Sequence, residues 1–187
     1  MLISEELEKS LKRAYDEAKR RQHEFIALEH LLLALIDDPV VAKILKKCNA
    51  DIAALKKDLE DFLENEMNDM RLGTDDFEPI HSLGVQFVLQ LAASHVQSAN
   101  LPHMDGGNVL VALFRERDSH AVYFLNQHNV TRLDVVKYLS HGIAKDDPAP
   151  IGDDEEAAAG SKAKPKKSPL ETFCINLNRS EEHTSEL

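Results

Sequence analysis

The chain has little of what a catalytic or ligand-enclosing protein normally needs, beginning with aromatic residues. It contains no tryptophan, and aromatic residues make up only 5% of its 187 residues. Pockets for organic ligands are usually lined with apolar and aromatic side chains, so we expect no large pocket of this kind. Cysteine is also scarce, and Cys48 and Cys174 show the spacing of neither a disulfide framework nor a metal-binding pair. Reduced thiols and a start without a secretion signal predict a cytoplasmic protein.

Long apolar runs and phosphate-binding loops are missing as well. The best apolar stretch, from Phe25 to Ile36, is interrupted by Glu29 and His30, and a membrane span needs about 18 continuous apolar residues. We therefore expect no contact with a membrane. The seven glycines contain no pair with the spacing of the loop G-x-x-x-x-G-K-[ST]. Neither ATP hydrolysis nor a bound cofactor is predicted for this chain.

Positive charge is in the minority. The chain has 22 lysines and arginines against 33 aspartates and glutamates, for a net charge of −11. Acidic residues also outnumber basic ones in the part before Gly142. A nucleic-acid partner requires basic surface to displace phosphate counterions, so this balance argues against one. A partner with a basic surface is more plausible.

Catalytic motifs are incomplete. His23 and Glu24 begin the zinc-protease pattern H-E-x-x-H, but the position of the second histidine holds Ala27. There is no G-x-S-x-G turn to expose a nucleophilic serine. We therefore predict no catalytic residue and no metal ligand. A metal-dependent hydrolase is the third class of function, with only the incomplete motif at His23 and Glu24 behind it. An incidental metal site that joins residues from different helices is left open.

The chain does contain an internal repeat, shifted by 78 residues through the second helical segment and by 80 residues after it. Apolar residues spaced at i, i+4, i+7 and i+11, one face of a helix, recur in the second half. The matched pairs are Leu7 with Val85, Leu11 with Leu89, Ala14 with Ala92, and Ala18 with Val96. Residues that cap helix starts recur too: Ser4 matches Ser82, Asp38 matches Asp118, and Asp51 matches Thr131. Ala27 stands opposite Asp105 and cannot accept a capping bond, so we expect its helix to start less firmly.

These patterns predict an all-α fold of two tandem four-helix repeats, packed as a pseudo-symmetric eight-helix domain. No strand pattern competes. A single four-helix unit would be short of core, which is a physical reason for duplication. The helices are expected at 4–22, 28–36, 39–47, 52–65, 82–98, 106–115, 119–127 and 132–140.

One segment carries a family resemblance. Residues 23–35, HEFIALEHLLLAL, resemble the signature of the Clp N-terminal repeats that precede the ATPase rings of Clp unfoldases of the ClpA, ClpB and ClpC types. Stretches at 95–98, 108–114, 132–136 and 140–142 resemble the ClpA branch in particular. The likeness covers about residues 1–143 and implies the double-repeat fold already expected from the periodicity.

The resemblance also implies a function in docking. It implies an adaptor-docking domain of a hexameric ATPase that feeds the protease ClpP, with the adaptor ClpS delivering substrates. Within the family, the acidic residues of the first repeat signature take part in that docking, and here they match Glu24 and Glu29, with His23 beside them. ClpP and the other hexamer subunits would be contacted only through the ATPase modules. The alternative is a stand-alone or ClpC/ClpB-type double repeat that binds unfolded segments or another adaptor directly.

The C-terminal part differs in composition from the repeats. Residues 1–143 are predicted as the double-repeat domain, and 144–169, rich in charge and proline, as a disordered linker. Residues 170–178 turn apolar again and resemble the stretch leading to the first ATPase module of the family. Residues 179–187 resemble a translated sequencing adapter.

Overall fold

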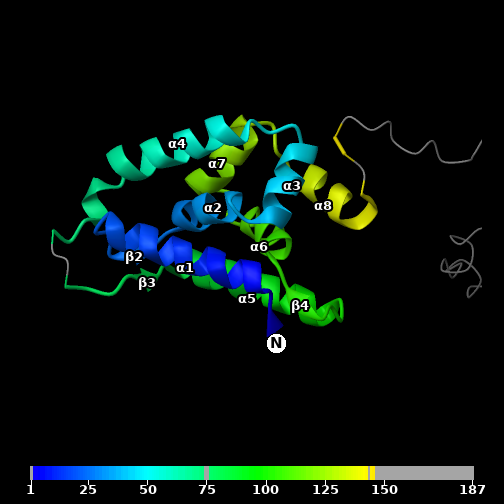
Figure 1. Ribbon diagram of the computed structural model, residues 1–187, viewed down its shortest axis with the longest axis horizontal. Helices are drawn as coiled ribbons and strands as arrows, with labels where there is room; N and C mark the ends of the chain where they lie inside the picture. The colour runs from blue at the N-terminus through cyan, green and yellow to red at the C-terminus, as the bar shows by residue number, and fades with distance from the viewer. Residues whose placement is uncertain (1, 74–75, 143, 146–187) are drawn as a thin grey trace, which may run out of the picture. The chain divides into compact units, whose positions relative to one another are not determined.

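The computed structural model describes residues 2–73, 76–142 and 144–145. These residues belong to the compact unit Met1–Ala149 and form eight α-helices (Figure 1). The helices are α1 (Glu5–Arg20), α2 (Leu28–Ile36), α3 (Pro39–Lys47), α4 (Ile52–Asn65), α5 (Leu83–Ser98), α6 (Gly106–Leu113), α7 (His120–Gln127) and α8 (Arg132–His141). A short 3-10 helix, Asn68–Met70, follows α4. The predicted all-α double repeat is confirmed. Of the predicted linker at 144–169, the structure describes Ala144 and Lys145. The rest of the linker and the segments predicted at 170–178 and 179–187 lie outside the described residues.

Side chains just before the helices explain where most of them begin. Ser4, Asp51 and Ser82 each accept a hydrogen bond from a backbone N–H in the first turn, as predicted. The expected cap of α7 was wrong by one residue: Ser119, rather than Asp118, accepts the hydrogen bond from the Val122 N–H at 3.2 Å. Because α6 also ends at Leu113 rather than at the expected residue 115, the α6–α7 connection is three residues longer than expected.

Four two-residue strands are a feature that the sequence analysis did not anticipate. β1 (Leu2–Ile3) pairs in parallel with β4 (His103–Met104), and β2 (Phe25–Ile26) pairs in parallel with β3 (Ile80–His81). The shift of 78 residues that relates the two repeats also relates β1 to β3 and β2 to β4. The strand that precedes the first helix of each repeat therefore pairs with a strand of the other repeat. Strands this short leave no alternating pattern in the sequence.

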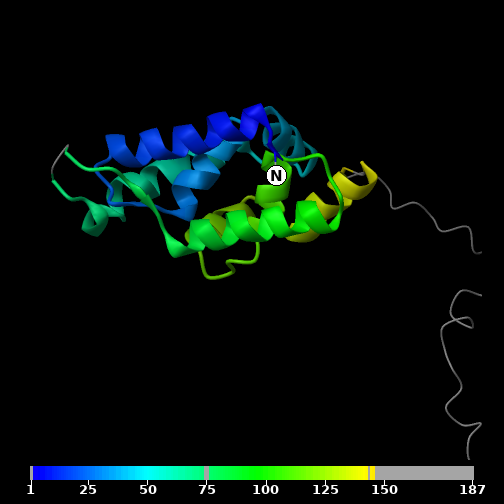
Figure 2. The same cartoon turned by 90° about the horizontal axis from the view of Figure 1, so that it is seen from below.

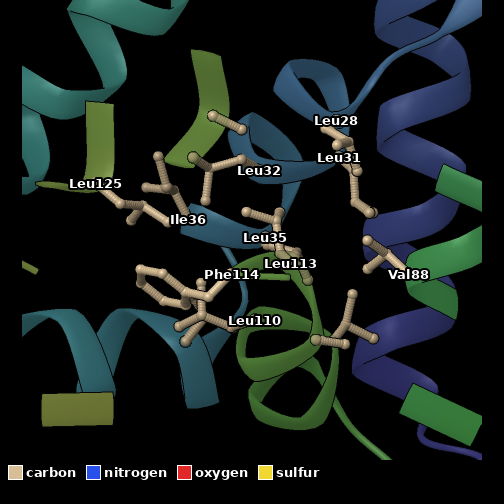
Figure 3. Close-up of a cluster of buried hydrophobic side chains, with 14 of the residues drawn as sticks. Leu28, Leu31, Leu32, Leu35, Ile36, Val88, Leu110, Leu113, Phe114 and Leu125 are labelled. Atoms are coloured by element: carbon tan, nitrogen blue, oxygen red, sulfur yellow. The ribbon is translucent and has the colours of Figure 1, made fainter. Parts of the chain in front are cut away.

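The core is built mainly from α2 and α6, the two most apolar helices. Figure 1 shows α2 and α6 in the middle of the domain, with α1 and α5 on one side and α4 and α7 on the other. Figure 2 shows α1 (blue) and α5 (green) running along opposite edges. In Figure 3, leucines from the central helices meet side chains from their neighbours; the labelled residues are Leu28, Leu31, Leu32, Leu35, Ile36, Val88, Leu110, Leu113, Phe114 and Leu125. The second helix of each repeat is therefore enclosed by both repeats.

Candidate functional site

Of the three residues expected to form the site, His23 and Glu24 lie in the loop between α1 and α2, and Glu29 lies in the first turn of α2. The backbone of the loop is fixed by bonds to the segment that connects the repeats. The Glu24 N–H donates to the Met70 carbonyl at 2.9 Å, and the Glu24 carbonyl accepts from the Ile80 N–H at 3.1 Å. Gln22 adopts a left-handed conformation with φ of 59°, which turns the chain at the end of α1. The loop therefore has a defined shape.

Glu24 and Glu29 differ sharply in exposure. Glu24 is exposed, as expected, but Glu29 is only 6% exposed, so the expectation that both carboxylates face solvent was wrong for Glu29. The Glu29 Oε1 atom accepts a hydrogen bond from the backbone N–H of Ala121 at 3.1 Å. Ala121 lies in the first turn of α7, where backbone N–H groups lack partners within the helix and a carboxylate is favoured. Glu29 therefore joins the start of α2 to the start of α7 in the other repeat.

In the second repeat, the equivalent contact joins the start of α6 to α3, and the α6 residues that make it are glycines, which have no side chain. Gly107 aligns with Glu29, and the start of α6 approaches α3 so closely that a Cβ on Gly107 would lie 3.2 Å from the Ile44 side chain. At the neighbouring Gly106, a Cβ would lie 2.9 Å from Asp38 Oδ2 and from Val41 Cγ2. The two repeats thus use different chemistry at the same pseudo-symmetric junction.

His23 is buried together with His30, and both have 0% exposure. His23 Nδ1 lies 2.9 Å from His30 Nε2, and His30 Nδ1 accepts from the Ala27 N–H at 3.0 Å. A neutral His30 that accepts at Nδ1 must carry its proton on Nε2 and donate it to His23 Nδ1. The proton of His23 is then on Nε2, a buried atom that has no hydrogen-bond partner among the described residues. His23 cannot reach a partner protein from this position.

Burial also determines the protonation of this pair. It lowers the pKa of His30 to about 3, with the neighbouring His23 and Arg21 adding to the effect. The pKa of His23 is lowered by burial first and by Arg71 and Arg21 next. Both imidazoles are therefore neutral at pH 7. They hold the loop in shape and carry no charge to offer an adaptor.

Sequence reasoning missed the role of His30 in starting α2. Ala27 makes no side-chain cap, but His30 at the third helical position binds the Ala27 N–H, which is half of a capping box. In the second repeat the box is complete, with Asp105 and Asn108 each accepting from the other's N–H at 2.9–3.0 Å. A histidine three residues after the N-cap position, Ala27, was the available signal.

An ionic cluster lies beside the loop. The Arg21 side chain is 5% exposed and donates to Glu17 Oε1 at 2.8 Å and to Glu64 Oε2 at 2.7 Å. Burial raises the pKa of Glu17, but hydrogen bonds from Arg20 and Arg21 outweigh burial and hold it at about 2. Arg71 also contacts Glu64, at 3.0 Å. These pairs join α1, α4 and the connecting segment, while Glu24 remains outside them.

The arrangement contains no nucleophile or metal site within the described residues. Burial raises the pKa of the Cys48 thiol to about 11, which keeps it protonated at neutral pH. No three histidine, cysteine, aspartate or glutamate side chains in the described part of the chain lie close enough together to hold a metal ion. Among the same residues, no helix is long and apolar enough to cross a membrane.

Comparison with known proteins identifies the family. The family described as Clp repeat (R) N-terminal domain matches residues 2–128. The chain belongs to the Clp N-terminal repeat family. A ClpA homolog protein from Fuscovulum blasticum is 40% identical over 183 residues, covering 94% of this chain but 23% of the relative. The chaperone protein ClpB of Prochlorococcus marinus is 42% identical over 65 residues, covering 34% of this chain and 8% of the relative.

Solved structures share the Clp repeat fold. The Hsp104 N-terminal domain from Candida albicans superposes with a TM-score of 0.66 at 14% identity, covering 77% of this chain and 95% of that one. The N-domain of ClpV from Vibrio cholerae gives a TM-score of 0.61 at 21% identity, covering 74% and 82%. The chain therefore spans about a quarter of its ClpA-like relative and most of the isolated Clp N-domains.

Proposed function

We propose that this Clp repeat domain docks the adaptor ClpS for a ClpA-type unfoldase in the cytoplasm, and that its residues bind without catalysing a reaction. The observation that carries the proposal is the exposed Glu24 on a clamped loop of the first repeat signature. The similarity to a ClpA homolog over 94% of the chain supports the ClpA branch. Delivery of substrates to ClpP would follow through the ATPase modules of the complete protein.

The three candidate residues then have different roles. Glu24 offers its carboxylate directly to a basic adaptor surface, where charge complementarity favours encounter and register. Glu29 and His23 act from inside: Glu29 fixes α2 against α7, and His23 supports the loop that presents Glu24. The position matching Glu24 in the second repeat is Pro102, which has no charge. One adaptor should therefore dock per domain, on the first repeat.

The test is reversal of the charge at Glu24 alone. Glu24→Lys should weaken ClpS binding roughly tenfold, or about 1–2 kcal/mol, as measured by calorimetric titration of ClpS into the whole chain. Glu29→Lys is unsuitable for this purpose, because it would place an unpaired charge in the buried junction with α7.

The matched control is Glu8→Lys. Glu8 is exposed on α1 and forms no ion pair within the described residues, so the change in net charge is identical. It lies near the other end of α1 from the loop, about 20 Å away at the helical rise per residue. Equal weakening by both variants would point to a long-range field, and unchanged binding by Glu24→Lys would remove this loop from the docking site.

Direct peptide binding is the second candidate function. One structural neighbour with a TM-score of 0.55 is described as a complex of a ClpV N-domain with a VipB peptide. At 19% identity that likeness shows the fold alone, so peptide binding by this chain is a proposal. Unfolded-protein binding that survives Glu24→Lys would favour it over adaptor docking.

A further inference from the structure

The arginines of the described residues fall into two groups. Four of them, Arg13, Arg20, Arg21 and Arg71, each lie within 4.0 Å of a carboxylate and form an ion pair. The remaining three form no ion pair in the described part of the chain, and all of them line one hollow: Arg115, Arg117 and Arg132. Unpaired arginines concentrated at one place are unexpected in a chain with a net charge of −11.

The hollow lies in the second repeat, between the α6–α7 connection and the start of α8. Its volume is about 320 Å³. Beside the three arginines, the lining contains three uncharged residues: Phe114, Val122 and Asn126. Phe114 and Val122 are buried and belong to the hydrophobic core, so this part of the lining is fixed by core packing. Asn126 adds an amide that can donate hydrogen bonds.

Nearby acids do not neutralise this hollow. Glu116 stands between two of the arginines in sequence, but its Oε2 atom lies 3.9 Å from the position that a Cβ on Gly84 would occupy, so it is directed toward α5. Asp118 is exposed, is not part of the lining and forms no ion pair within the described residues. The positive charge is therefore available to a partner.

We propose that this hollow, which we call the arginine pocket, binds an acidic peptide segment through its carboxylate side chains. A guanidinium presents a planar fork of N–H donors that matches a carboxylate with two parallel hydrogen bonds. Three such forks suit a segment with several neighbouring carboxylates. Some first-turn N–H groups of the nearest helices already have partners: Glu29 and Ser119 accept from Ala121 and Val122 of α7, and Thr131 accepts from Asp134 of α8.

The arginine pocket is separate from the proposed adaptor site. Every residue of its lining belongs to the second repeat, whereas Glu24 belongs to the first and would attract a basic surface. A domain with both sites could hold an adaptor at one and an acidic segment of a client protein at the other. Because no adaptor is needed to test the pocket, its failure and that of the adaptor proposal are distinguishable.

The experiment measures fluorescence anisotropy of a labelled peptide of alternating glutamate and glycine, titrated with the whole chain. The same peptide with glutamine in place of glutamate is the ligand control. We expect binding of the glutamate peptide that weakens as salt is raised. Arg115→Gln with Arg117→Gln and Arg132→Gln should weaken it roughly tenfold or more. The corresponding arginine-to-lysine variants keep the positive charge but lose the planar guanidinium, so their affinity for the peptide should lie between that of the parent chain and that of the glutamine variants.

A matched control removes equal charge elsewhere. Lys43→Gln with Lys57→Gln and Lys137→Gln neutralises three lysines that form no ion pair within the described residues and lie outside the pocket. These variants should bind the peptide nearly as well as the parent chain. Equal weakening in both sets would overturn the pocket in favour of a general field. Inorganic phosphate that competes as strongly as the peptide would overturn the peptide assignment.

A second chain controls for the acidic run at positions 153–156 of the sequence by removing its charge. It carries Asp153→Asn, Asp154→Asn, Glu155→Gln and Glu156→Gln. Peptide binding by this chain at least as tight as by the parent would show that the pocket takes the added acidic peptide. Absence of peptide binding in both the parent and this chain would overturn the proposal.

Discussion

At the scale of single residues, the buried histidine pair makes stability depend on pH. His30 has a folded-state pKa of about 3, against about 6.5 when unfolded. A lowered histidine pKa contributes stability that is fully present above about pH 6.5 and is lost as the pH falls toward the folded value. The unfolded chain binds the extra protons, so acid favours unfolding.

We therefore predict a loss of stability in mild acid, before most carboxylates titrate. The free energy of unfolding should fall by up to about 1.4 kcal/mol per pH unit for each histidine between about pH 6 and pH 5. Urea unfolding at the two pH values provides the measurement. His30→Gln keeps an acceptor for the Ala27 N–H but does not titrate, so this variant should lose much of the dependence. An identical pH dependence in both proteins would mean that His30 is not held neutral.

The start of α2 provides a second test at the same scale. Ala27→Thr or Ala27→Asp adds the missing cap, and the free energy of unfolding should rise by about 0.5–2 kcal/mol. Asp105→Ala, which breaks the complete capping box of α6, should lower it by a similar amount. Urea unfolding again measures both. If threonine stabilises and aspartate destabilises, the cost of a charge at this buried position exceeds the gain from the cap.

At the scale of elements, contact between the repeats depends on how closely α6 approaches α3. Gly106→Ala would place its Cβ 2.9 Å from the Asp38 and Val41 side chains, below any normal contact. We predict a loss of about 1–3 kcal/mol in the free energy of unfolding, since these packed side chains must move.

Gly84→Ala is the comparison. Gly84 lies within α5, and its Cβ would meet only the end of the Leu28 side chain at 3.3 Å and the Glu116 carboxylate at 3.9 Å. Alanine favours a helix over glycine by about 1 kcal/mol, so this change should be neutral or stabilising. Thermal unfolding of both variants should separate them by several degrees; similar values would mean that the α3–α6 junction relaxes freely.

At the scale of the whole molecule, the repeats should resist protease as one body. Contacts continue just past Gly142: the Lys145 N–H donates to the Lys47 carbonyl at 3.0 Å, and its side chain pairs with Asp134. Limited proteolysis followed by mass spectrometry should therefore leave a fragment that ends between Gly142 and Ala149. A protected fragment that extends beyond Pro169, or a cut between the repeats near Gly73, would contradict this.

Much of this molecule could be predicted from local sequence alone. Helix bounds and the repeat follow from apolar periodicity and from caps such as Ser4 and Ser82, which act within a few residues of themselves. Glu24 was also placed correctly at the surface, because it lies in the connection before the apolar run of α2. These features depend on neighbours in sequence, so the order of residues is enough to specify them.

Only the tertiary structure decided the rest. Glu29 is buried because its partner, Ala121, is 92 residues away and reaches it only when the repeats pack. His23 and His30 become a neutral pair because both are enclosed, and the arginine pocket forms because residues of the α6–α7 connection, α7 and α8 converge. The parallel strand pairs join segments from different repeats. Periodicity specifies which face of a helix is apolar, but which side chains meet across elements depends on how the helices pack in three dimensions.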